Sequence, residues 1–251
     1  MARYVDLIQI ALVAMGFLVA GIVKGATGLG YSTSALPVLT IAVGLHTAMP
    51  LVLFPSMASN LTVMAGAGHF SGTLRRFLPL YIALVPGLVF GLALMLWIDQ
   101  DVAAGLLGLV IIAYCGIAIW RPALHLPDRL ERPLQIPVGL LNGTVNGLTG
   151  SQIMPLVPFM LSLKLDPDRF VQAVNIGFTL SSLVMVLGLS RAGLLTWSTL
   201  LVSVAGIAPA MLGSWFGGIL RRRLSEAKFR LLVLGALMVL GAVLVSPLFN
   251  R

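Results

Sequence analysis

Apolar segments make up most of this chain, and the short loops between them hold nearly all of its charged residues. A membrane-spanning helix needs about 20 predominantly apolar residues, and several of the segments reach that length. We therefore predict an all-α polytopic membrane protein. Ten apolar segments can be recognised: Leu7–Val23, Ser32–Leu45, Thr47–Ala67, Phe77–Ile98, Val102–Trp120, Leu134–Leu148, Ile153–Leu163, Phe170–Leu189, Leu194–Leu220 and Phe229–Leu248.

The composition supports a membrane protein that uses the whole chain as one polytopic domain. Hydrophobic residues make up 59% and charged residues 10%, against about 45–50% and about 25% in soluble domains. The net charge of +8 does not indicate a nucleic-acid partner, because the basic residues lie in short loops that orient helices in the lipid bilayer. With a single cysteine and no cluster of Cys and His residues, we expect no metal and no cofactor.

A glycine-rich sequence occurs twice, near the end of the first apolar segment and near the end of the sixth. The residues that match at constant spacing are Gly21 and Gly143, Gly25 and Gly147, Thr27 and Thr149, and Gly28 and Gly150. Paired glycine interruptions in two hydrophobic halves point to a transporter's substrate site. We predict two transmembrane repeats, residues 1–120 and 134–251, joined by a polar cytoplasmic linker over residues 121–133.

The segments that flank the glycine-rich sequences are short. Ser32–Leu45 and Ile153–Leu163 fall well below the length of a spanning helix, and Leu134–Leu148 is marginal. We therefore expect the first two segments of each half to form a helical hairpin that is broken at the glycine motif. Whether these hairpins cross the bilayer or only re-enter it stays open at this point.

The basic residues gather on one side of the predicted topology, which should be cytoplasmic. Twelve of the 16 Lys and Arg residues fall there: Arg75, Arg76, Arg121, Arg129, Arg132, Lys164, Arg169, Arg221, Arg222, Arg223, Lys228 and Arg230. This arrangement places both termini outside and makes the two repeats inverted, because each half crosses the bilayer an odd number of times. The predicted location is the cell (inner) membrane.

The motif Gly21-x3-Gly25-x2-Gly28-x-Gly30, followed by Pro37 and repeated after the linker, resembles the TauE/SafE/YfcA family of transporters, also called sulfite exporters. The resemblance covers the whole chain. It implies a transporter rather than an enzyme, with sulfite, sulfoacetate or another small organosulfonate as the exported substrate. The first motif departs from the family's denser glycine run, since Tyr31-Ser32-Thr33-Ser34 follows Gly30.

The distribution of charge favours an anionic substrate. All eight acidic residues fall in predicted loops or segment ends, so cation transport and coupling through a buried carboxylate are disfavoured. Lys24 is the only Lys or Arg placed in a glycine break, and an ionisable residue inside the membrane is a functional candidate. Alternatively, Lys24 extends from the end of a full-length first helix to the cytoplasmic surface.

The glycine breaks also supply hydrogen-bond donors. Helices that begin at Tyr31 or Ser32, and at Ser151 or Gln152, would point free N–H groups at an oxyanion. The glycines could instead serve tight helix packing, and the amides on the third segments could simply hold helices together. The candidate substrate-binding residues are Lys24, Gly25, Thr27, Gly28, Gly30, Ser32, Thr33, Asn60, Asn146, Thr149, Gly150, Ser151, Gln152 and Asn175.

The predicted function is export of a small sulfur-containing anion by alternating access, driven by the membrane potential as a uniporter. Uptake of sulfate, thiosulfate or another small anion is the alternative. An intramembrane enzyme would need a nucleophile with a base, or a metal, and Cys115 has no His or acidic residue near it in sequence. The expected partners are the small anion and the lipid bilayer, while the anion's identity, the coupling and the oligomeric state stay open.

Overall fold

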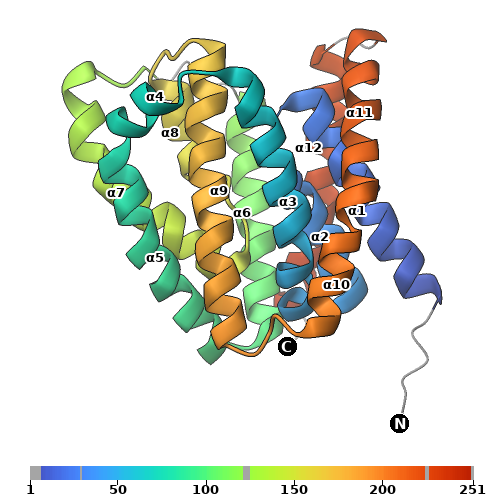
Figure 1. The fold of residues 1–251 in the computed structure, drawn as a ribbon. Helices are drawn as coiled ribbons and strands as arrows, with labels where there is room; N and C mark the ends of the chain where they lie inside the picture. Colours follow the sequence, from blue (N-terminus) through green and yellow to red (C-terminus); the bar gives the residue numbers. More distant parts are fainter. Residues whose placement is uncertain (1–6, 29, 121–124, 224–225, 250–251) are drawn as a thin grey trace.

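The computed structural model describes residues 7–28, 30–120, 125–223 and 226–249, and these residues form a bundle of helices without strands (Figure 1). The helices of the first half are α1 (Leu7–Thr27), α2 (Tyr31–Val43), α3 (Leu45–Ala67), α4 (Phe70–Arg76), α5 (Leu78–Trp97) and α6 (Gln100–Trp120). Those of the second half are α7 (Asp128–Thr149), α8 (Leu156–Ser162), α9 (Pro167–Arg191), α10 (Trp197–Ala205), α11 (Ile207–Arg223) and α12 (Glu226–Val245), followed by the 3-10 helix η1 (Ser246–Phe249).

The prediction of an all-α polytopic membrane protein is confirmed. In the described ranges, seven segments are long and apolar enough to cross a membrane: α1, α3, α5, α6, α9, α12 with η1, and α10 together with α11. Large apolar side chains face outward, among them Leu187, Leu232 and Val239, which are 65%, 69% and 65% exposed. Such an outer surface suits lipid, because soluble monomers seldom expose large contiguous apolar patches.

The first glycine break is shorter than the sequence suggested. Helix α1 continues through Lys24 to Thr27, so the expectation that Lys24 lies in the break is wrong. Among the described residues, only Gly28 and Gly30 lie between α1 and α2. Gly28 and Gly30 have φ angles of 76° and 81°, a backbone conformation that residues with a Cβ rarely adopt. Helix α2 then begins at Tyr31, as predicted.

The second break differs more. Helix α7 ends at Thr149 and Gly150 takes a φ of 74°, but residues 151–155 are not helical and α8 begins only at Leu156. The expected helix start at Ser151 or Gln152 is therefore wrong. The backbone N–H of Leu156 donates to Asn142 Oδ1 at 3.1 Å, so a side chain of α7 satisfies a first-turn donor of α8 and fixes where that helix starts.

Two helix pairs approach closely through glycines. A Cβ added at Gly25 would strike the carbonyl oxygen of Ser214, so α1 lies directly on α11. A Cβ at Gly147 would likewise strike the carbonyl oxygen of Leu88, which brings α7 onto α5. Within each pair the two helices run parallel, because a residue later in one helix contacts a residue later in the other. These glycines therefore occupy helix crossings, which is the packing role that the sequence also allows.

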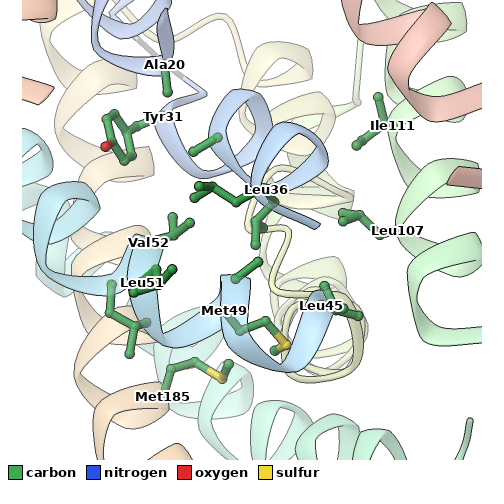
Figure 2. Close-up of a cluster of buried hydrophobic side chains, with 14 of the residues drawn as sticks. Ala20, Tyr31, Leu36, Leu45, Met49, Leu51, Val52, Leu107, Ile111 and Met185 are labelled. Carbon is green, nitrogen blue, oxygen red and sulfur yellow. The ribbon is translucent and has the colours of Figure 1, made fainter. Parts of the chain in front are cut away.

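The interior is built around α2 and α3. Figure 2 shows Tyr31 and Leu36 of α2 lying over Met49 and Val52 of α3, with Leu107 of α6 beside them. Helix α2 has 13 residues, and most of its side chains are buried, on every face of its first three turns. A helix too short to cross a bilayer is tolerated at membrane depth when protein surrounds it.

A proline in α3 explains a contact between the halves. Pro55 has no N–H, so the carbonyl of Leu51, four residues earlier, lacks its helical donor. Ser203 of α10 donates its Oγ–H to this carbonyl at 2.8 Å and accepts from the N–H of Phe54 at 3.3 Å. Ser203 is fully buried, so the bond forms away from water.

Replacing Ser203 with alanine should destabilise the protein, because the Leu51 carbonyl would be left buried without a donor, at a cost of about 1–3 kcal/mol. Thermal unfolding in detergent would measure the effect. Thr62→Ala is the matched control, since the exposed Thr62 hydroxyl bonds only the carbonyl of Ala58 in its own helix. Equal melting temperatures for the two variants would contradict the proposed role of Ser203.

Candidate anion site

Lys24 is the centre of a buried polar cluster. Its side chain is 1% exposed, so it does not extend to the surface of the bundle. Its Nζ donates to Asn60 Oδ1 of α3 and to Asn175 Oδ1 of α9, each at 2.8 Å. The ring of Phe178 lies 5.9 Å from the Nζ atom. Three helices from both halves of the chain thus converge on one ammonium group.

The positive charge of Lys24 is met by neutral groups. Among the residues that the structure describes, no carboxylate lies within ion-pair distance of Nζ, and the ion pairs Arg76–Glu131 and Arg169–Asp166 lie in other parts of the bundle. Two amide oxygens and an aromatic face stabilise a cation only in part. A buried charge normally needs an opposite charge, so this site is suited to an anion.

Hydrogen bonds extend the cluster from Lys24 toward α2. Asn60 Nδ2 donates to Ser56 Oγ at 3.4 Å, and Ser56 Oγ lies 2.9 Å from Ser32 Oγ. All three side chains are buried. The network therefore connects the end of α1 with the first turn of α2, which is the region on both sides of the first glycine break.

The other end of this network borders a small cavity of about 10 Å³. Its polar lining comes from both halves of the chain: Ser32 and Ser56 from the first, and Asn146, Gly150, Gln152 and Ser182 from the second. Leu36 and Met49 lie 3.1 Å and 3.2 Å from the position of a Cβ at Gly150. A cavity of this size holds about one water molecule, so the site is closed in this conformation.

Second-half residues that line the cavity, or that neighbour its lining in sequence, carry further polar groups. Gln152 Nε2 donates to Ser182 Oγ at 3.0 Å and to the carbonyl of Phe178 at 3.3 Å. Asn146 Nδ2 and Ser151 Oγ are buried and have no hydrogen-bond partner among the described residues. Thr149 bonds within its own turn, donating to the carbonyl of Val145 at 2.7 Å.

The sequence-derived candidates fall into three groups in the structure. Those in the central cluster and at its cavity are Lys24, Ser32, Asn60, Asn146, Gly150, Gln152 and Asn175, with Thr149 and Ser151 beside them. Those at a larger pocket are Thr27, Gly30 and Thr33. Gly25 lies at the crossing of α1 and α11, and Gly28 has open space around it.

Phe178 was missed from the sequence, although a helical pattern could have indicated it. Asn175, Phe178 and Ser182 are spaced by three and four residues, so they share one face of a helix. Arg230 was also missed, because a basic residue at the end of an apolar segment is already explained by its effect on orientation. The structure places it on the wall of the larger pocket.

Comparison with known proteins gives one match, to a family model. The model described as Sulfite exporter TauE/SafE matches residues 12–244, nearly the whole chain. No curated protein and no solved structure matches the chain.

Proposed function

The chain belongs to the sulfite exporter TauE/SafE family of membrane transporters, and from this premise we propose that it exports a small sulfur-containing anion. Sulfite, or an organosulfonate such as sulfoacetate, is the proposed substrate. The family is one of transporters, and the seven apolar segments make the chain a multi-pass membrane protein.

The observation that carries the proposal is the Lys24 cluster. Its ammonium group donates to two amide oxygens, which leaves one of its three N–H donors for a substrate. A sulfonate or sulfite oxygen at this position would supply the negative charge that the site lacks. Asn146 Nδ2 and Ser151 Oγ, both without partners among the described residues, would then donate to the remaining oxygens.

Alternating access is the proposed mechanism. The central cavity, which Leu36 and Met49 line beside Gly150, holds about one water molecule. Lys24 is buried, so an anion can reach it only after helices move. The two parallel glycine-packed pairs, α1 with α11 and α5 with α7, support a relation between the halves in which α7 corresponds to α1 and α11 to α5. We propose that these inverted repeats move against one another around the site.

The membrane potential is the proposed driving force. An inside-negative potential favours outward movement of an anion by ~2.3 kcal/mol per charge per 100 mV, which corresponds to a gradient of roughly 50-fold. Proteoliposomes with imposed potassium diffusion potentials would test this idea. Efflux should rise with the inside-negative potential, whereas flux that ignores the potential but depends steeply on pH would contradict uniport.

The orientation in the membrane is also a proposal. Arg75, Arg76, Lys164 and Arg169 lie at the ends of α4, α8 and α9, at the top of Figure 1, and we assign this end to the cytoplasm. Both chain ends then lie on the side of the inner membrane opposite the cytoplasm. Residues 1–6 and 250–251, and Arg121 in the linker, are not among the residues that the structure describes.

A binding screen on the purified protein would test the substrate class. A ligand that binds only the folded state raises the apparent stability by RT ln(1 + [L]/Kd), about 2.7 kcal/mol at 100 times the Kd. Sulfite and sulfoacetate should therefore raise the melting temperature, and sodium or choline added with an inert counter-ion should not. Stabilisation by sulfate or thiosulfate alone would favour the uptake function instead, and stabilisation by none of these anions would contradict an anion transporter.

A further inference from the structure

A larger pocket, of about 280 Å³, lies apart from Lys24. Its polar lining includes Thr27 at the end of α1, Thr33 and Ser34 at the start of α2, and Arg230 at the start of α12. Phe170, near the start of α9, also lines it. The pocket therefore reaches the end of the bundle where α9 and α12 begin, which is the end assigned above to the cytoplasm.

One wall of this pocket is the first turn of α2. The helix begins at Tyr31 after Gly30, so its first N–H groups have no partner within the helix and form the positive end of its dipole. Ser34, in this first turn, is 5% exposed and its Oγ has no hydrogen-bond partner among the described residues. Both features favour an oxygen-rich anion at this wall.

A second wall carries a fixed positive charge. Arg230 Nη2 donates to the carbonyl of Ala118 in α6 at 2.8 Å. A guanidinium has five N–H donors, so this bond holds the group in place while using only one of them. The rest of the described lining contains no acidic residue and is largely apolar, with Val23, Val157 and Val233 among its members.

We propose that this pocket is a second anion subsite, a cytoplasmic vestibule that binds an organosulfonate before it reaches Lys24. The sulfonate group would lie between Arg230 and the first turn of α2, and the carbon chain would lie against the valines. Lys24 is not part of this lining, although its neighbours Val23 and Thr27 are. The proposal rests on the proposed transport function, which it extends by a separate step of substrate binding.

A charge-preference experiment tests the Arg230 wall without any substrate. Thr27 is an exposed position on the lining, and Thr27→Cys places a reactive thiol there. The measured quantity is the ratio of two labelling rates, that of an anionic sulfonatoethyl thiosulfonate over that of its cationic trimethylammonium counterpart. This ratio should be roughly tenfold higher in Thr27→Cys than in Thr27→Cys with Arg230→Gln. The protein with only its buried Cys115 is the blank. Arg230→Lys should retain the preference, because it keeps the charge. An unchanged ratio in Arg230→Gln would overturn the proposal.

Protection by sulfoacetate tests the subsite itself. Sulfoacetate should slow labelling of Thr27→Cys about tenfold at saturation, and this protection should persist with Lys24→Gln and with the control Arg169→Gln, but disappear with Arg230→Gln. Loss of protection in Lys24→Gln would mean a single site and would overturn the proposal, as would the absence of protection in the parent. Neither result decides whether Lys24 binds an anion, because sulfite-dependent melting of the Lys24 variants measures that separately.

Discussion

Replacing Lys24 with methionine should abolish stabilisation by sulfite while the protein still folds, and should leave sulfoacetate only its binding at the pocket of Arg230. Loss of one partner of a buried charge pair costs about 2–5 kcal/mol of binding free energy, a loss of about 30-fold or more in affinity. Methionine has a similar length and removes a buried charge, which offsets the two hydrogen bonds lost to Asn60 and Asn175. Ligand-dependent melting of the purified variant would measure both effects.

Two further variants make the interpretation specific to charge. Asn175→Asp places a carboxylate where the amide oxygen lies 2.8 Å from Nζ, so Lys24 would be neutralised inside the protein and an anion should no longer bind at this cluster. Lys164→Gln removes an exposed lysine and should leave binding unchanged. If Lys24→Met and Asn175→Asp bound sulfite as tightly as the parent, the buried cluster would not be the substrate site.

The residues of the Lys24 cluster could be predicted from sequence because polar groups are rare in apolar segments. Lys24, Asn60 and Asn175 each interrupt an apolar run, and the structure brings their side chains together although 151 positions of sequence separate Lys24 from Asn175. A buried amide or ammonium needs a polar partner in the membrane. Because an apolar segment offers few polar side chains, the residues that can partner one another are few, and the sequence alone identifies them.

The exact course of the breaks could not be predicted in the same way. Glycine lowers helix propensity by about 1 kcal/mol, and the sequence alone does not tell whether tertiary packing overrides that cost. At Gly25 packing against α11 overrides it, and α1 remains helical through Lys24. At the second break, the start of α8 depends on Asn142 Oδ1, a contact between residues whose proximity the hydropathy pattern does not reveal.

Glycines at helix crossings should respond to an added Cβ differently from glycines with open space around them, and α11 has one of each kind at neighbouring positions. A Cβ at Gly217 would strike the carbonyl oxygen of Ile22 in α1, whereas a Cβ at Gly218 meets nothing within 4 Å. Gly217→Ala should therefore force the two helices apart and destabilise the protein by about 1–3 kcal/mol. Gly218→Ala should be neutral or stabilise it by up to about 1 kcal/mol, since alanine has the higher helix propensity.

Thermal unfolding in detergent compares the two variants directly, and substrate binding extends the comparison to the site. Gly217 packs against Ile22 only two residues before Lys24, so separating α11 from α1 should also move Nζ relative to Asn60 and Asn175 and weaken anion binding. Gly218→Ala should leave binding unchanged. Equal melting of the two variants would show that the α1–α11 crossing tolerates added volume, and the glycines of the duplicated motif would then need a role other than packing.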